Sequence, residues 1–100
     1  MIHVVAIITA KPGQRTAVLE HFQANVPAVR AEAGCIEYGA ATDIETMGNA
    51  TFGPDTFVVI EKWESDDHLK AHAAAPHMKA YAAKTKDMLA GRVIHVLAPV

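Results

Sequence analysis

The 100-residue chain predicts a single α+β domain, and three observations lead to that prediction. Short β-branched apolar runs alternate with longer segments in which apolar residues recur at helical spacing, so strands and helices are interleaved. Clusters of glycine, proline and asparagine separate these segments, as turns do. No repeat, linker or low-complexity segment divides the chain, so residues 1–100 are expected to share one core.

The first strand and the first helix are distinguished by the spacing of their apolar residues. Residues 2–9 form an apolar, β-branched run that stops at the Lys-Pro-Gly sequence of residues 11–13. From residue 14 a helix is predicted, and it is expected to end at Gly34, because glycine is favoured at helix C-caps. Pro27 lies inside this helix and is expected to kink or briefly break it. The apolar residues that recur at helical spacing are Val18, Phe22, Val26 and Val29.

Two strands follow, separated by a long connection. Residues 35–42 alternate enough to predict a second strand, and residues 56–63 predict a third. Between them, residues 43–55 show no period and contain two glycine turns. This connection is longer than a hairpin needs, so it is a candidate lid or a flap that contacts a partner. A simple surface insertion is the alternative.

The last third of the chain predicts a helix in two pieces and a final strand. Ser65 suits the N-cap of the first piece, because two aspartates follow it and meet the positive end of the helix dipole. Pro76 suits the first turn of the second piece, which is expected to cover residues 77–90. Residues 92–98 predict the final strand. The resulting order, β-α-β-β-α-β, is that of the ferredoxin-like plait.

The predicted strands are apolar on both faces. In the first strand Val4 and Ile8 lie on one face, and Val5 and Ile7 lie on the other. The third and last strands repeat this pattern. Helices cover only one face of a two-layer plait, so the other face needs a second cover. A second copy of the chain is the obvious cover, and the pattern therefore predicts a homodimer whose sheets face each other.

Charge and composition argue against several classes of partner. The formal net charge of −2 argues against binding to nucleic acid or to a membrane surface. No apolar run approaches the roughly 18 residues that span a bilayer, and the start of the chain lacks the features of a secretory leader. The single cysteine, Cys35, cannot form an internal disulfide and suits a reducing compartment. The sequence thus predicts a soluble, cytoplasmic protein.

Candidate site residues gather on the second and third predicted strands. Phe57, Glu61 and Trp63 share one face of the third strand, and Tyr38 lies on the second. A carboxylate on an apolar face is costly unless it is paired or functional, so Glu61 either pairs with a nearby lysine or stands at the mouth of a cleft. Trp63 either stacks on a flat substrate or anchors the core, and Tyr38 either contacts a ligand or fills the interior.

Three histidines lie on or beside the helix that follows the third strand. His72 is three residues after Leu69, which must pack inward, so His72 is expected at the wall of a pocket. There its imidazole either binds or deprotonates a substrate, or is satisfied by a backbone carbonyl or by Glu61. His77 either caps the next helical piece or points into the same cleft. His68 and His72 are four residues apart but lack a clear third ligand, so no metal site is predicted.

The sequence contains no recognisable cofactor motif. It has no Gly-rich phosphate loop, no dinucleotide fingerprint and no serine elbow, and the chain is too small to enclose a flavin comfortably. Cys35 lacks a dedicated base, which favours a structural thiol over a nucleophile. We therefore expect no cofactor, and any redox chemistry has to use the electrons of the substrate itself.

Three short motifs, spread over most of the chain, are together typical of one family. They are Gly34-Cys35 followed by Tyr38, Glu61-Lys62-Trp63 at the end of the third strand, and His72 followed by Pro76-His77. With these motifs the chain resembles the antibiotic biosynthesis monooxygenase family of small dimeric α+β barrels. The resemblance implies a homodimer in which two sheets close into a barrel, while each subunit keeps a pocket between its sheet and its helices.

The resemblance also implies a reaction. Members of the family oxidise electron-rich phenols or quinols to quinones with molecular oxygen, without a metal or an organic cofactor. The substrate would then be a small aromatic molecule, and His72 would be the catalytic base or the partner of the phenolate. The substrate-binding residues would be Trp63, Tyr38, Glu61, His77 and Phe57.

Two departures from relatives bear on the alternatives. Val59 stands where some relatives place an asparagine, four residues before the strand-end tryptophan. Residues 2–9 lack the asparagine that haem-degrading relatives place on the first strand, which weakens a haem-degrading function. The other alternative is a dimeric protein that binds a hydrophobic small molecule, or answers stress, without turnover, because a fold does not fix a function.

Overall fold

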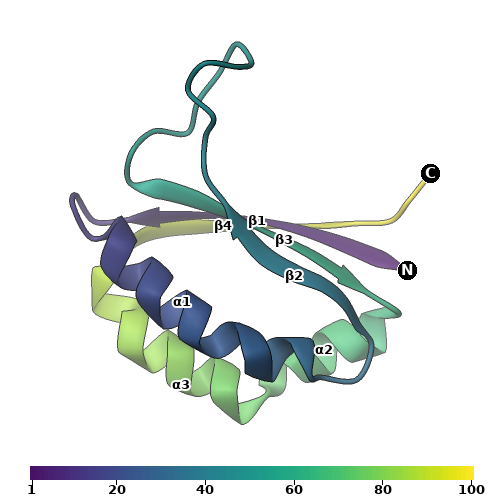
Figure 1. Cartoon of the computed structure of the whole chain (residues 1–100). Helices are drawn as coiled ribbons and strands as arrows, with labels where there is room; N and C mark the ends of the chain where they lie inside the picture. Colours follow the sequence, from purple (N-terminus) through teal and green to yellow (C-terminus); the bar gives the residue numbers. More distant parts are fainter.

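Four antiparallel strands form one sheet in the order β2-β3-β1-β4, and all the helices pack on one of its faces (Figure 1). This computed structural model describes residues 1–100, and none of its helices has the length and apolar character that a membrane crossing requires. The chain has the predicted α+β, ferredoxin-like order, with its second helix divided before Pro76. In chain order the elements are β1 (Ile2–Ala10), α1 (Arg15–Arg30), β2 (Cys35–Ala41), β3 (Thr56–Trp63), α2 (Asp66–Ala74), α3 (Pro76–Thr85), a 3₁₀ turn η1 (Lys86–Met88) and β4 (Leu89–Leu97).

Helix α1 differs from the prediction at its C-terminal end. It stays helical through Pro27 and ends at Arg30, rather than breaking at Pro27 or continuing to Gly34. Proline lacks an N–H donor, but its carbonyl can continue the helix, and the carbonyl of Pro27 accepts from the N–H of Ala31 at 3.1 Å. Gly34 lies in the turn before β2 with a φ of +80°, where an added Cβ would clash with the His68 ring.

The last strand begins earlier than predicted. Helix α3 ends at Thr85, and β4 begins at Leu89 rather than at residue 92. Leu89 pairs with Ala10 at the end of β1, after a shift in register. Pairing with β1 therefore overrides the helical pattern of these residues. The limits of the other three strands agree with the prediction to within one residue.

The core lies between the sheet and the helices. Phe22 of α1 stacks on Tyr38 of β2 with 5.2 Å between ring centroids, and it meets Phe57 of β3 edge-on at 5.9 Å. These aromatic contacts fix α1 across the two strands that carry the predicted site residues. The apolar residues that α1 and β1 bury in this core are Val18, Phe22, Val26, Val29, Val4, Ala6, Ile8 and Ala10.

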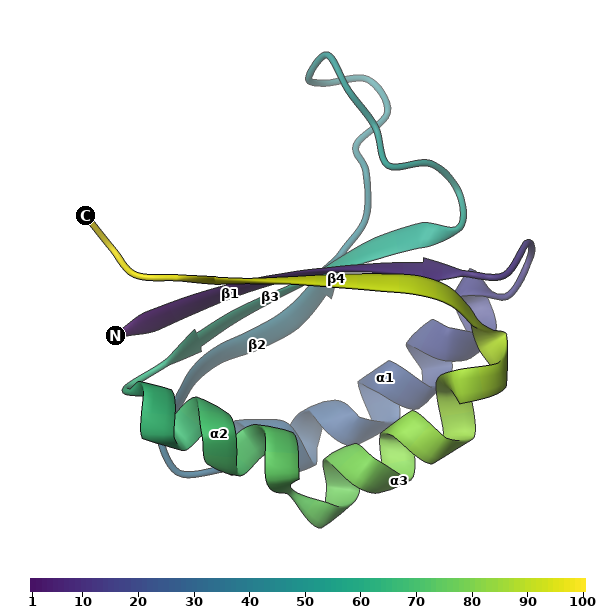
Figure 2. The ribbon, with the colours of Figure 1, turned by 180° about the vertical axis from the view of Figure 1, so that it is seen from behind.

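The opposite face of the sheet carries no helix (Figure 2). Val5 and Ile7 of β1 lie half-buried on this open face, and their strand neighbour Ile60 on β3 is 41% exposed. Strand β1 thus divides its apolar residues between two faces, as the sequence indicated. The structure contains one chain, so the predicted homodimer stays a prediction.

The loop of residues 43–55 rises from the sheet on its open side (Figures 1 and 2). Asp43 closes the base of this loop, because its carboxylate accepts hydrogen bonds from the backbone N–H groups of Phe52 and Gly53 at 2.9–3.0 Å. These bonds hold the pKa of Asp43 below its usual value. Three large apolar side chains of the loop are exposed: Ile44, Met47 and Phe52. Its role as a lid or a partner-contacting flap stays a prediction.

Candidate active site

The helix-facing side of β2 and β3 brings the predicted strand residues together. Tyr38 lies opposite Glu61 in the β2–β3 ladder, and Trp63 follows two residues further along β3 on the same face. Phe57 lies on this face as well, and all four side chains are buried. Trp63 has no exposed surface, so it is an anchor of the core whatever else it does.

His72 lies above these residues and faces inward. Ser65 caps α2 by accepting the N–H of His68 at 3.2 Å, and α2 then presents His72 as its only buried residue. The imidazole centroid is 4.6 Å from that of the Trp63 ring and 5.6 Å from that of Tyr38. The inward position predicted from the Leu69 spacing is therefore observed.

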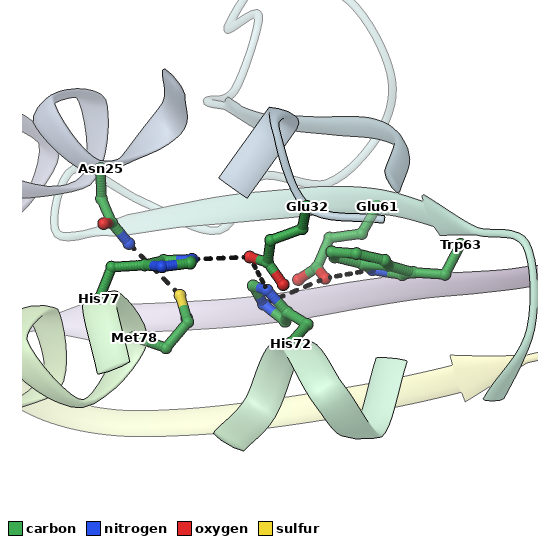
Figure 3. Close-up of polar contacts among 7 residues, drawn as sticks. All are labelled: Asn25, Glu32, Glu61, Trp63, His72, His77 and Met78. Atoms are coloured by element: carbon green, nitrogen blue, oxygen red, sulfur yellow. Dashed lines mark hydrogen bonds and ion pairs between the residues drawn. The ribbon is translucent and has the colours of Figure 1, made fainter. Parts of the chain in front are cut away.

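Glu32 connects His72 to His77 (Figure 3). It lies in the turn between α1 and β2, and its Oε2 atom is 2.8 Å from His72 Nδ1 and 2.7 Å from His77 Nε2. Nothing in the sequence pattern singled out Glu32, because a turn residue belongs to no periodic face. The available signal was chemical, since an inward-facing histidine requires a hydrogen-bond partner.

Glu61 is satisfied by Trp63, so the first of its two predicted alternatives, pairing with a lysine, is wrong. Trp63 Nε1 donates to Glu61 Oε1 at 2.9 Å, while Lys62 pairs with Glu37 at 3.3 Å. Burial raises the pKa of the Glu61 carboxyl, and the Trp63 hydrogen bond and the nearby His72 offset only part of that effect. Glu61 Oε1 is also 3.9 Å from His72 Nε2, so His72 has a carboxylate beside each ring nitrogen.

The two nitrogens of His72 have different environments. Nδ1 is held by Glu32, whereas Nε2 makes no hydrogen bond and lies 3.9 Å from the nearest carboxylate oxygen. Every fully buried side-chain nitrogen and oxygen of the protein has a hydrogen-bond partner, so the unpaired Nε2 is an atom that solvent still reaches. One nitrogen fixed and one free is the arrangement that a general base requires.

The other titratable groups around the site favour their neutral forms. Burial, reinforced by the charge of Glu61, raises the pKa of Tyr38 well above its usual value, and burial raises the pKa of Tyr81 to about 12. Burial also raises the pKa of Cys35, and the carboxylates of Glu32 and Glu61 add to the effect. Cys35 is therefore a poor nucleophile near neutral pH, which agrees with the predicted structural thiol.

Two hollows of the protein are lined by residues near the site, and His72 lines neither of them. One is a groove of about 180 Å³ between α1 and α3, and the other, of about 360 Å³, lies along the edge strand β2. Of the predicted site residues, His77 borders the groove and Tyr38 borders the β2 hollow. His72 itself is 5% exposed.

Glu32, His72 and His77 are also the residues that bring metal-ligating atoms together. The atoms they offer lie within 4.8 Å of one another. His68 is not part of this group, because its Nδ1 is 2.7 Å from Ser65 Oγ. The histidine pair that the structure brings together is therefore His72 with His77, rather than His68 with His72.

Comparison with known proteins identifies the family. Residues 1–84 match the family described as antibiotic biosynthesis monooxygenase. The chain belongs to this family. A relative from Escherichia coli K12, named probable quinol monooxygenase YgiN, is 41% identical over 102 aligned residues, which cover 99% of this chain and 98% of the relative.

Solved structures agree with this assignment. PA3566 from Pseudomonas aeruginosa is similar with a TM-score of 0.84 at 28% identity, over 99% of this chain and 93% of that one. Rv0793 from Mycobacterium tuberculosis is similar with a TM-score of 0.83 at 26% identity, over 99% of this chain and 94% of that one. The family resemblance and the fold that the sequence predicted are both confirmed.

Proposed function

We propose that the protein is a cofactor-independent monooxygenase that oxidises a phenolic or quinol-type aromatic molecule with molecular oxygen. Family membership and the name of the Escherichia coli relative support the reaction class. One observation carries the assignment of the base: Glu32 holds Nδ1 of the buried His72 at 2.8 Å and leaves Nε2 without a hydrogen bond.

His72 acts as the general base in this proposal. A proton on Nδ1, donated to Glu32, leaves the Nε2 lone pair free to accept the phenolic proton of the substrate. The imidazolium that forms lies between Glu32 and Glu61, whose carboxylates stabilise its positive charge. Trp63 and Tyr38, whose rings flank the imidazole, supply aromatic surface for a flat substrate.

The reaction balances with the substrate as its only source of electrons. The phenolate transfers one electron to dioxygen, and the superoxide combines with the substrate radical to form a carbon–oxygen bond. The imidazolium returns its proton to the peroxide, which gives a hydroperoxide on the ring carbon. Loss of the remaining hydrogen of that carbon as a proton breaks the O–O bond, and the hydroxide leaves as water. One oxygen atom stays as the quinone carbonyl.

Substrate access requires a movement of α2. This helix spans only Asp66–Ala74 and buries one residue, His72, whereas α1 buries four. Few buried side chains of α2 therefore have to leave the core when the helix lifts, and short elements with few buried contacts open most easily. In this proposal α2 lifts to admit the substrate between His72, Trp63 and Glu61.

A homodimer and a cytoplasmic location complete the proposal. Val5, Ile7 and Ile60 are apolar side chains on the open face of the sheet, and face-to-face packing of two such sheets would bury them in a dimeric barrel. The single thiol of Cys35 suits a reducing compartment.

Oxygen uptake by the purified, metal-stripped protein tests the proposed function. The substrates are a panel of hydroquinones and naphthols, and the variants are His72→Ala and His68→Ala. General-base catalysis contributes about 10²–10⁴-fold to a rate, so His72→Ala should lose uptake by that factor. His68→Ala removes a histidine of the same helix that lies outside the Glu32 network, so it should retain most of the uptake.

The outcomes separate the candidate functions. Uptake that survives in His72→Ala contradicts the assignment of the base. Tight binding of a panel compound without any uptake contradicts turnover and favours a small-molecule-binding protein, the alternative that the enclosed position of His72 supports. Circular dichroism of each variant verifies that a lost activity is not a lost fold.

A further inference from the structure

Two imidazoles and one carboxylate converge from three separate segments of the chain. Glu32 comes from the turn after α1, His72 from α2, and His77 from the first turn of α3. The ligand atoms that they offer all lie within 4.8 Å of one another. We propose that Glu32, His72 and His77 form a binding site for a divalent transition-metal ion, with Zn²⁺ as the best fit.

A local rearrangement of the three side chains converts the present hydrogen bonds into a coordination sphere. Glu32 Oε2 is 2.8 Å from His72 Nδ1 and 2.7 Å from His77 Nε2. Ligand atoms bound tetrahedrally to zinc at about 2.0–2.2 Å are roughly 3.4 Å apart, so each contact has to lengthen by about 0.6 Å. Glu32 lies in a turn and can supply this lengthening, whereas His72 Nδ1 and His77 Nε2, which lie within 4.8 Å of each other, have to approach to the same distance by rotation of their side chains.

The surroundings of His72 suit a metal-bound imidazole. When one ring nitrogen binds a metal, the other carries the proton and usually donates it to a carboxylate or a carbonyl. His72 Nε2 lies 3.9 Å from Glu61 Oε1, and Trp63 fixes that carboxylate with a hydrogen bond of 2.9 Å. Glu61 is thus placed to accept the Nε2 proton when Nδ1 is metal-bound.

The donor set selects the class of ion. Imidazole nitrogens suit Zn²⁺, Co²⁺, Ni²⁺ and Cu²⁺, whereas Mg²⁺ and Ca²⁺ prefer all-oxygen sites. Three protein ligands leave a fourth position for water, and His77 borders the groove between α1 and α3, which gives an ion a route from solvent. The sequence-based expectation of no metal site rested on His68 and His72, and it could not include a carboxylate that joins His72 only in the folded chain.

An ion at this site would regulate the oxygenation, and this part of the inference rests on the proposed function. Zn²⁺ on Nδ1 of His72 confines the imidazole proton to Nε2. That nitrogen is the one that has to accept the proton of the substrate. The metal-bound protein therefore lacks its base, and Zn²⁺ acts as a reversible inhibitor.

A Zn²⁺ titration against a chromophoric chelator measures binding without reference to activity. The wild-type protein should bind one ion per chain. Glu32→Gln and His77→Gln should each weaken binding at least about tenfold. His95→Gln removes an exposed histidine of β4 outside the cluster, so it should bind like the wild type. Co²⁺ provides a second measurement, because its tetrahedral absorption bands should appear in the wild type and disappear in His77→Gln.

The experiments test the metal site and the proposed oxygenation independently. No Zn²⁺ binding by the wild type, or binding that survives both Glu32→Gln and His77→Gln, overturns the site and leaves the proposed oxygenation standing. Zn²⁺ binding by a protein that takes up no oxygen supports the site and removes its regulatory role. Inhibition of oxygen uptake over the same Zn²⁺ concentrations as the titration supports both parts.

Discussion

The two faces of the sheet differ in what they carry. The helix-covered face is an apolar core interrupted by polar groups, of which Glu61 lies on the sheet and His72 lies over it. No fully buried side-chain nitrogen or oxygen there lacks a hydrogen-bond partner. The open face carries the apolar side chains of Val5, Ile7 and Ile60 and no helix. One sheet therefore presents a covered face with buried polar groups and an uncovered face with exposed apolar side chains beside the Lys62–Glu37 ion pair.

This difference assigns the candidate active site to the covered face and the association of two chains to the open face. A buried carboxylate costs stability unless it is paired, so its place on the covered face is evidence of a site. Apolar side chains left on a surface are evidence of a partner. Substitutions on the covered face should therefore change folding or activity, and substitutions on the open face should change the association of two chains.

Removal of Trp63 should have the largest effect. Trp63→Ala should lower the free energy of unfolding by about 3–5 kcal/mol, because it leaves a cavity and removes the hydrogen bond to the buried Glu61 carboxylate. Urea denaturation measures the change. Trp63→Phe keeps most of the volume and should cost less. Equal costs for the two variants would show that the hydrogen bond, rather than packing, sets the stability.

A charge on the open face should act on assembly and not on the fold. Ile60→Glu should weaken the proposed dimer by about 100-fold, or about 2.7 kcal/mol, while far-UV circular dichroism stays unchanged. Sedimentation velocity measures the association. Ile94→Glu is the matched control, because Ile94 is 50% exposed but lies opposite Ala6 on the other face. A monomeric wild type, or an Ile60→Glu protein that remains a dimer, contradicts the assembly.

Loss of the α2 cap should have a moderate effect on the covered side. Ser65→Ala removes the acceptor for the His68 N–H and should cost about 1 kcal/mol of stability. Because α2 carries His72, oxygen uptake should fall as well. Thermal unfolding and initial rates measure the two effects. Ser65→Thr keeps a capping hydroxyl, so an equal loss in that variant would mean that the cap is not the cause.

The smallest effect is expected at the base of the loop on the open side. A carboxyl whose folded pKa is lowered contributes stability above its unfolded pKa, and loses that contribution as pH falls through the folded value. The pKa of Asp43 is lowered from 3.8 by the N–H groups of Phe52 and Gly53. Wild-type stability should therefore decline below about pH 4 more steeply than that of Asp43→Asn. Parallel thermal-unfolding curves for the two proteins below that pH would refute this assignment.

Periodicity and turn chemistry were sufficient for most of the fold. The apolar face of α1, the limits of β3, the cap at Ser65 and the two apolar faces of β1 all follow from residues that are neighbours in the chain. The early start of β4 did not follow, because Leu89 takes its conformation from Ala10, far away in sequence. Family motifs also placed Trp63, Glu61 and His72 at one site, although no pattern supplied their partners.

The sequence by itself determined the order of the elements, the composition of each sheet face and the histidines worth testing, because these depend on local spacing and on side-chain chemistry. Only the tertiary structure decided how the polar groups pair. Glu32 forms hydrogen bonds with His72 and His77 across separations of 40 and 45 residues, and Glu61 accepts a hydrogen bond from Trp63 rather than pairing with a lysine. Such pairs form where burial forces each polar group to find a partner, and the fold alone sets which partner is within reach.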